Sequence, residues 1–445
     1  MTAVRASRKS YSGKPLKLSP ALGGALAFLG IDRCLPVLHG SQGCTAFALV
    51  LAVRHFREAI PLQTTAMSEL SSILGGTENL EQAIVNIRER AGPRLIGICS
   101  TALTEIRDED IAGDLRMMRA DHPEWTNLAV VYASTPDFLG GLQEGWARAV
   151  EAIVAKLVPP SGDLKRPRQV NLLAGSHLSA GDIETLKDVI VAFGLTPIVL
   201  PDLSSSLDGH VPEDHVPTTL GGVSLEEISR MGQSAVTFAV GEHMRGAAEL
   251  LQRQAGVPYR VFDRLTGLEA FDGFVAELMT ASGASAPARL HRQRSRLIDA
   301  MLDAHSYFAQ RSVAIAAEPD LLLTLSSFVT ELGSCVPVAI STTDAPALTR
   351  VPSPKIIVGD LDDLEQAVGE IPGGVDLILS NAHAAETAKL FDVPLIRAGF
   401  PILDRLGQQV TVGYDGTRDL LFQLANTFIE RASTHPDAAM GKHAH

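Results

Sequence analysis

The residues with the clearest capacity for chemistry lie at positions 39–47, in the sequence His-Gly-Ser-Gln-Gly-Cys-Thr-Ala-Phe with Cys44 near its centre. The apolar run 34–38 before this stretch predicts a strand, and the segment 46–53 after it is rich in helix formers. Cys44 is therefore expected in the first turn of a helix, where backbone N–H groups and the helix dipole favour a thiolate. Thiolates are the ligands that soft metals and iron–sulfur clusters require. A buried thiol beside a glycine turn is the plain alternative.

The remaining cysteines, 34, 99 and 335, do not complete a metal site by themselves. Cys34 and Cys99 lie in apolar strand-like runs, where buried thiols are ordinary, and the spacings match no ferredoxin pattern. A cluster normally takes four protein ligands. If Cys44 is a ligand, the others must come from elsewhere, and a second subunit is the natural source.

Several other kinds of site are excluded by their missing motifs. The chain contains no Gly-x-x-x-x-Gly-Lys-Ser/Thr phosphate loop, no Gly-x-Ser-x-Gly elbow and no His-Glu-x-x-His zinc helix. The pairs Gly23-Gly24 and Gly221-Gly222 do not make a dinucleotide fingerprint. No catalytic residue is assigned.

Alternating strand and helix patterns predict an α/β fold with three Rossmann-like domains and mostly parallel sheets. Breaks rich in Pro, Gly and small residues at 159–167 and 281–287 mark the expected boundaries. The predicted organisation is an N-terminal arm (1–18), a first domain with the Cys44 motif (19–160), a second (166–284), a third (285–434) and a tail (435–445). The arm is expected to become ordered only against a partner.

Composition supports a folded chain of more than one domain. It has 445 residues, of which 46% are hydrophobic and 20% charged. A net charge of −13 argues against general nucleic-acid binding. No apolar stretch approaches the 18 residues or so that a membrane span needs, and sparse cysteines exclude a disulfide scaffold. We expect a soluble, cytoplasmic protein.

Beyond these generic signals, the segments 39–47 and 54–58 closely resemble the β-type subunits of the nitrogenase component 1 family. The resemblance continues through segments spread over nearly the whole chain: 61–67, 135–138, 201–204, 206–210 and 397–401. It implies three Rossmann-like domains of the nitrogenase component 1 type.

The resemblance also implies which cluster the chain can hold. The catalytic β subunit supplies three cysteines to the eight-iron P-cluster. Cys44 matches one of them, but Ser19 and Ala102 stand at the other two positions, and Cys99 is three residues from the latter. Because neither serine nor alanine ordinarily replaces a thiolate as a soft ligand, half a P-cluster is not expected here.

What remains resembles the β-like half of the scaffold that matures the iron–molybdenum cofactor. The resemblance implies that Cys44 is this chain's one ligand to a 4Fe–4S cluster shared with a NifE-like partner in an α2β2 heterotetramer. It further implies that the complex, mainly through the partner, holds a cofactor precursor delivered by a donor protein, with the nitrogenase iron protein docking transiently.

Two alternatives stay open. One is a β-type subunit of a catalytic nitrogenase-like reductase, acting on a tetrapyrrole or on dinitrogen. The other is a solute-binding α/β protein without a metal. A scaffold is favoured over a stand-alone enzyme. Arg54, His55 and Arg57 could add positive charge near a cluster, although capping their own helix is the simpler role.

Overall fold

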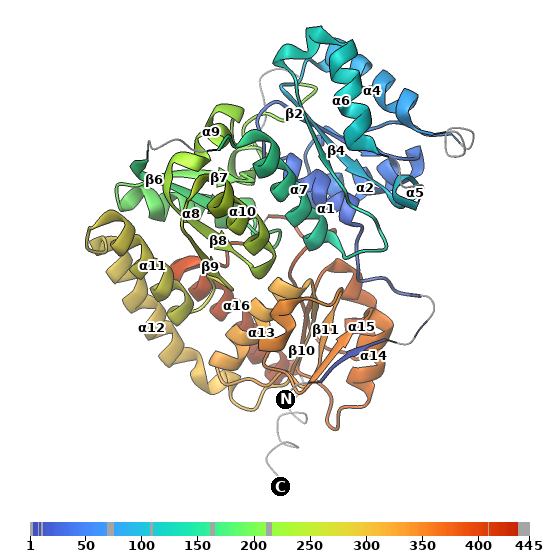
Figure 1. Ribbon diagram of the computed structural model, residues 1–445. Helices are drawn as coiled ribbons and strands as arrows, with labels where there is room; N and C mark the ends of the chain where they lie inside the picture. Colours follow the sequence, from blue (N-terminus) through green and yellow to red (C-terminus); the bar gives the residue numbers. More distant parts are fainter. Residues whose placement is uncertain are drawn as a thin grey trace. The chain divides into compact units, whose positions relative to one another are not determined.

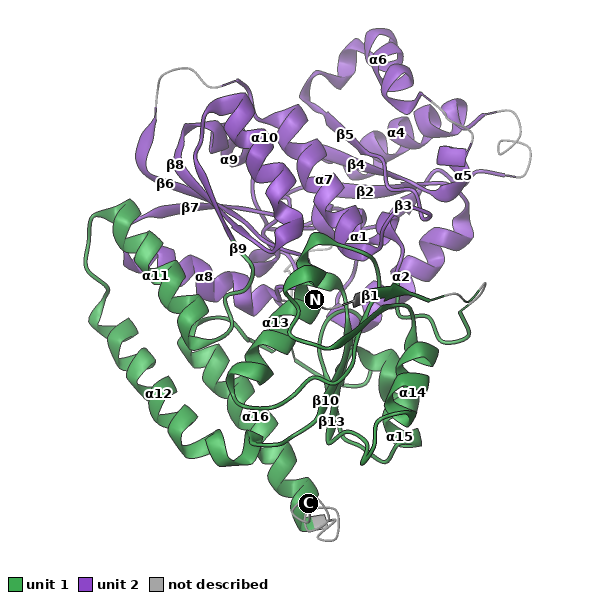
Figure 2. Cartoon of the chain, turned by 60° about the horizontal axis from the view of Figure 1, so that its bottom comes forward, with its two compact units in different colours: residues 1–17, 262–445 green, residues 18–261 purple. Residues whose placement is uncertain are grey.

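Three β-sheets with parallel pairing carry the fold, as seen in a computed structural model (Figure 1). The residues described are 3–7, 9, 12–68, 75–106, 110–160, 165–210, 216–407 and 409–434. Residues 18–261 form one unit with two of the sheets, and residues 1–17 and 262–445 form the other unit (Figure 2).

The first sheet of residues 18–261 carries the Cys44 motif. Its strand order is β3 (Gln63–Thr64), β2 (Cys34–His39), β4 (Leu95–Ser100) and β5 (Ala129–Ala133). Ile96 and Ile98 of β4 belong to the core that α4 (Thr77–Ala91) and α6 (Ile111–Asp121) cover. Gly97, between them, faces Phe28 of α1 (Pro20–Phe28) on the opposite side, as the alternation of a strand requires.

The second sheet of this unit has the order β7 (Thr196–Leu200), β6 (Arg166–Leu173), β8 (Ser234–Val240) and β9 (Tyr259–Phe262). Its helices are α8 (Ala180–Ala192), α9 (Leu225–Arg230) and α10 (Arg245–Ala255). The long α7 (Leu142–Leu157) contacts both α1 and α10, and so joins the two sheets into one unit.

The third sheet belongs to the other unit and is covered on both faces. Its order is β1 (Ala3–Ala6), β12 (Lys355–Val358), β11 (Ala339–Ser341), β10 (Val313–Ala317), β13 (Leu377–Ser380) and β14 (Leu395–Arg397). Alternate residues of β10 enter two different cores. One core contains α12 (Ala288–Phe308), α13 (Pro319–Glu331) and α16 (Gly413–Thr434), and the other contains α14 (Leu361–Gly369) and α15 (Ala385–Leu390).

The described part of the N-terminal arm lies on this third sheet. Strand β1 pairs in parallel with β12, from Ala3 opposite Lys355 to Ala6 opposite Val358. The expected break at 281–287 covers the last two residues of α11 (Leu268–Ser282) and the connection to α12, two helices of the same unit. The tail at 435–445 lies outside the described residues, as does part of the first break, 161–164.

The predicted fold class is confirmed, because parallel α/β sheets make up both units. Sequence patterns did not predict β1, α5 (Ala102–Ile106), α6 or α11. Among the helices of the described ranges, none combines the length and the apolarity that crossing a bilayer demands.

Candidate metal centre

Cys44 lies in the first turn of α2 (Gln42–Phe56), directly after β2. The helix begins after Ser41, whose backbone is extended (φ −73°, ψ 156°). The Ser41 hydroxyl lies 3.5 Å from the Cys44 sulfur. Because the Cys44 side chain is exposed, its sulfur is accessible to a metal from outside the chain.

The turn before Cys44 is braced by Thr65, which follows the short strand β3. The Thr65 hydroxyl oxygen accepts a hydrogen bond from the Gly40 N–H at 3.1 Å and lies 3.0 Å from Nδ1 of His39. The Met67 N–H donates to the Gly40 carbonyl at 3.0 Å. The segment 61–67, which the sequence marked only by resemblance, therefore shapes the cysteine turn.

A second brace comes from Thr101, at the end of β4. Its hydroxyl donates to the His39 carbonyl at 2.9 Å. A Cβ atom built on Gly40 would lie 2.4 Å from this hydroxyl oxygen, so a glycine is required for the close approach. The carboxyl ends of β2 and β4 thus meet at the turn that presents Cys44.

The two other cysteines in the same unit as Cys44 are poorly suited to hold a metal as thiolates. Cys34 and Cys99 are buried, and burial raises the pKa of both thiols well above the ordinary range. Cys335 is exposed but belongs to the other unit, where its S–H group donates to the Arg311 carbonyl at 3.3 Å. Within the described residues, no group of three or more His, Cys, Asp and Glu side chains is arranged to hold a metal ion.

Ser19 and Ala102 stand at the two positions where, by resemblance, the catalytic β subunit has cysteines. Neither side chain is a soft metal ligand. Ser19 is the N-cap of α1, and its hydroxyl oxygen accepts the Ala21 N–H at 3.2 Å. Ala102 is the first residue of α5, directly after β4. The donor set of this chain therefore fits a cluster that takes one thiolate here and the rest from a partner, and it does not fit half a P-cluster.

Apolar side chains are exposed near the cysteine in sequence. Phe47 and Val50, about one and two turns after Cys44 on α2, are 68% and 54% exposed. Exposed apolar side chains so close to a motif favour a surface that another protein covers.

The C-terminal end of α2 lies next to a contact with the segment 206–210. Arg57 ends the helix in the left-handed conformation (φ 63°). Next to it, a Glu58 carboxylate oxygen accepts the Gly209 N–H at 2.9 Å, so the segments 54–58 and 206–210 meet. Burial raises the pKa of Glu58. With a rise of about 1.5 Å per residue, Arg54 and Arg57 stand roughly 15–20 Å along the axis from Cys44, which fits capping rather than contact with a cluster.

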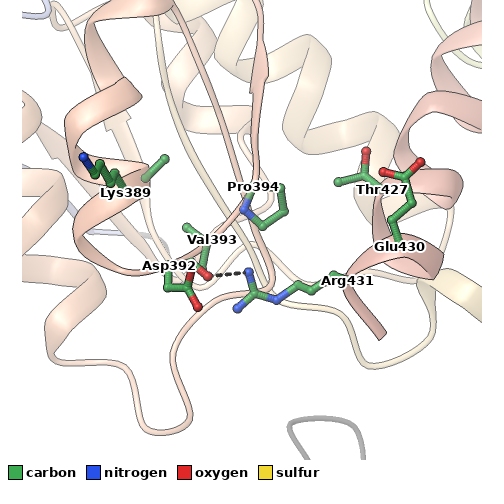
Figure 3. Close-up of a pocket in the computed structure, with 8 residues that line it drawn as sticks. Lys389, Asp392, Val393, Pro394, Thr427, Glu430 and Arg431 are labelled. Atoms are coloured by element: carbon green, nitrogen blue, oxygen red, sulfur yellow. Dashed lines mark hydrogen bonds between the residues drawn. The ribbon is translucent and has the colours of Figure 1, made fainter. Parts of the chain in front are cut away.

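A hollow of about 390 Å³ lies in the other unit, at the edge of the third sheet (Figure 3). Asp392, Pro394 and Arg431 are among its lining residues, and the Arg431 guanidinium donates to the Asp392 carbonyl at 2.8 Å. It is lined by no cysteine or histidine, and so it offers no soft ligand.

A family model described as nitrogenase component 1 type oxidoreductase matches residues 19–429. The chain belongs to this family. It is 49% identical to the nitrogenase iron-molybdenum cofactor biosynthesis protein NifN of Bradyrhizobium diazoefficiens, over 96% of this chain and 92% of that protein. It is also 49% identical to NifN of Rhodobacter capsulatus (96% and 93% covered) and 39% identical to NifN of Klebsiella pneumoniae (97% and 94% covered).

Solved structures of the nitrogenase component 1 family share the fold. A chain of "Nitrogenase Cp1 at pH 6.5" superposes with a TM-score of 0.91 at 29% identity, covering 96% of this chain and 95% of that one. The family resemblance inferred from the sequence segments is thereby confirmed over nearly the full chain.

Proposed function

We propose that this chain is a scaffold subunit for assembly of the nitrogenase iron–molybdenum cofactor, and that Cys44 is its ligand to a 4Fe–4S cluster shared with a NifE-like partner. Relatives with 39–49% identity over nearly the full length carry the name iron-molybdenum cofactor biosynthesis protein. These names do not favour the catalytic reductase considered as the alternative.

The observation that carries the proposal is the exposure of a single thiol on a braced turn. Cys44 is accessible, while Cys34 and Cys99, the other thiols of its unit, are buried. One thiolate cannot complete a four-ligand cluster. The cluster must therefore lie at an interface, and the exposed Phe47 and Val50 supply apolar surface for a partner to cover.

The chain's own residues hold the ligand in place. Thr65 and Thr101 fix the turn before Cys44 through the contacts of Gly40 and His39. The sulfur therefore points outward from a preorganised backbone, as a ligand shared between subunits requires. When bound, the cluster would supply electron transfer. The proposed assembly is an α2β2 heterotetramer that receives a precursor from a donor protein, holds it mainly in the partner and docks the nitrogenase iron protein transiently.

The test compares two exposed cysteines in the complex co-purified with its NifE-like partner. Iron content and EPR spectra before and after dithionite are measured for the wild type, Cys44→Ala and Cys335→Ala. We expect a reduced 4Fe–4S signal in the wild type and in Cys335→Ala, and its loss in Cys44→Ala. Full iron content in Cys44→Ala would overturn the ligand assignment. Reduction of a tetrapyrrole by the purified complex would overturn the scaffold function.

A further inference from the structure

The third sheet ends at β14, whose second edge is open. Among the described strands, β14 pairs with β13 alone. The Pro394 carbonyl and the Ala398 N–H bond to β13, at 3.1 and 2.8 Å. Because backbone groups alternate between the two edges of a strand, Leu395 and Arg397 direct their N–H and C=O groups away from β13. These two residues therefore form the free edge of β14.

Two hollows lie along β14, with volumes of about 390 and 520 Å³. They share Pro394, directly before the strand, with Thr427 and Glu430 of α16, so they are parts of one groove. Figure 3 shows the first hollow, with Pro394 on one side and the two α16 side chains on the other. Leu406, from the loop after β14, lines the second hollow and is 82% exposed. We call the two hollows together the β14 groove.

The edge that borders this groove offers hydrogen-bond donors. Within the ranges that the structure describes, the backbone N–H groups of Leu395 and Arg397 have no acceptor. The Leu395 carbonyl accepts the Arg397 guanidinium at 2.9 Å, and Asp404 accepts the same guanidinium at 2.6 Å. Outward N–H groups on alternate residues are the donors with which the carbonyls of an added strand pair. The backbone of β14 is therefore suited to bind an extended segment.

The lining of the β14 groove carries a surplus of positive charge. Four cations and two anions contribute to it: Lys389, Arg397, Arg405 and Arg431, against Asp392 and Glu430. The whole chain has a net charge of −13, so this surplus is local. Complementary charge accelerates association and disfavours partners of like sign. The groove therefore selects an acidic segment, and the exposed Leu406 favours one that also carries apolar side chains.

We propose that the β14 groove is a docking site for an acidic, extended segment of a partner protein, which adds to β14 as a strand. Carbonyls of the segment accept the N–H groups of Leu395 and Arg397, its carboxylates pair with the cations of the groove, and its apolar side chains cover Leu406. At about 3.3 Å per residue, the stretch 393–397 holds about five residues of such a segment. The groove lies outside residues 18–261, the unit that carries Cys44, so the inference does not depend on the cluster.

The first test measures charge selection on the full chain with two synthetic peptides. One consists of four Glu-Val repeats, and the control consists of four Lys-Val repeats. We expect the acidic peptide to bind and to slow amide exchange of Leu395 and Arg397, and the basic peptide to do neither. Arg405→Glu should weaken the acidic peptide roughly tenfold, whereas Arg292→Glu, at an exposed position of α12 in the same unit, should not. Equal binding of both peptides, or full affinity in Arg405→Glu, would overturn the inference.

The second test separates strand addition from binding by charge alone. Leu395→Pro removes an N–H group that the sheet does not use. We expect this variant to lose affinity for the acidic peptide while amide exchange of β13 stays unchanged. Full affinity in Leu395→Pro would overturn strand addition. Protection of the Arg397 amide without peptide would overturn the choice of occupant: a second copy would be indicated if the protection rises with concentration, and another segment of this chain if it does not.

Discussion

The Nζ atom of Lys9 lies 3.0 Å from Oδ1 of Asp363, across 354 positions of sequence. Asp360 lies 3.4 Å from the same ammonium. Both carboxylates belong to the start of α14, where Asp360 and Asp363 form a capping box. The N-terminal arm is therefore held on this chain's own third sheet by charge as well as by β1 pairing.

We expect Lys9→Ala to loosen the arm without unfolding the unit. The ion pair is partly exposed, so its loss should cost about 0.2–1 kcal/mol, and less at high salt because ions screen it. Amide hydrogen exchange of β1 at low and high salt measures the effect. Arg5→Ala removes the same charge from an exposed position in β1 and should change exchange less. Identical exchange in the two variants would exclude a specific role for Lys9.

Thr65 offers a test of the brace behind Cys44. Thr65→Val removes the buried hydroxyl that accepts the Gly40 N–H, and a buried donor that loses its partner costs about 1–3 kcal/mol. We expect lower stability and lower iron content in the complex. Thr65→Ser keeps the hydroxyl and should retain both. Normal iron in Thr65→Val would show that the cluster does not need this brace.

The crossing of α1 and α7 predicts opposite outcomes for two glycines in helices. Gly23→Ala should destabilise the chain by at least about 2 kcal/mol, because the added Cβ would meet the Leu142 carbonyl at 1.9 Å. Gly273→Ala, in α11 with no atom within 4 Å of the added Cβ, should stabilise its helix by about 0.5–1 kcal/mol. Amide hydrogen exchange of each altered helix measures both changes. A tolerated Gly23→Ala would contradict the close crossing.

His122 predicts a pH dependence of stability. Hydrogen bonds to Glu81 (2.8 Å) and Glu124 (2.9 Å) raise the pKa of His122 above its ordinary value. The stabilisation is therefore fully present below the ordinary histidine pKa of about 6.5 and is lost as the pH rises through the folded-state value.

The measurement is thermal unfolding from pH 6 to pH 9, followed by tryptophan fluorescence. Trp125 contributes to this signal, and its ring centroid lies 4.4 Å from that of the stacked His122 ring. His122→Gln should flatten this part of the pH profile. His305→Gln, whose ring nitrogen contacts the Leu302 carbonyl rather than a carboxylate, should leave it unchanged. An unaltered profile in His122→Gln would assign the dependence to other groups.

The sequence by itself determined the fold class, most strands and the candidate ligand. Strands such as β2 and β4 are continuous apolar runs, and they are recognisable because both faces of a parallel sheet are buried. Cys44 was found because glycines, a preceding strand and a following helix are local signals that need no distant partner.

Tertiary structure alone decided the contacts around that cysteine. The short β1 has no hydrophobic pattern of its own and is a strand only because β12 pairs with it. The segments that contain Thr65, Thr101 and Asp137 were recognised in the sequence, but the sequence did not predict which residues they contact. Ser19 and Asp137 are 118 positions apart, and they meet because two helices cross at glycines. A hydrogen bond between side chains that distant in sequence depends on the packing of whole elements, which no local pattern encodes.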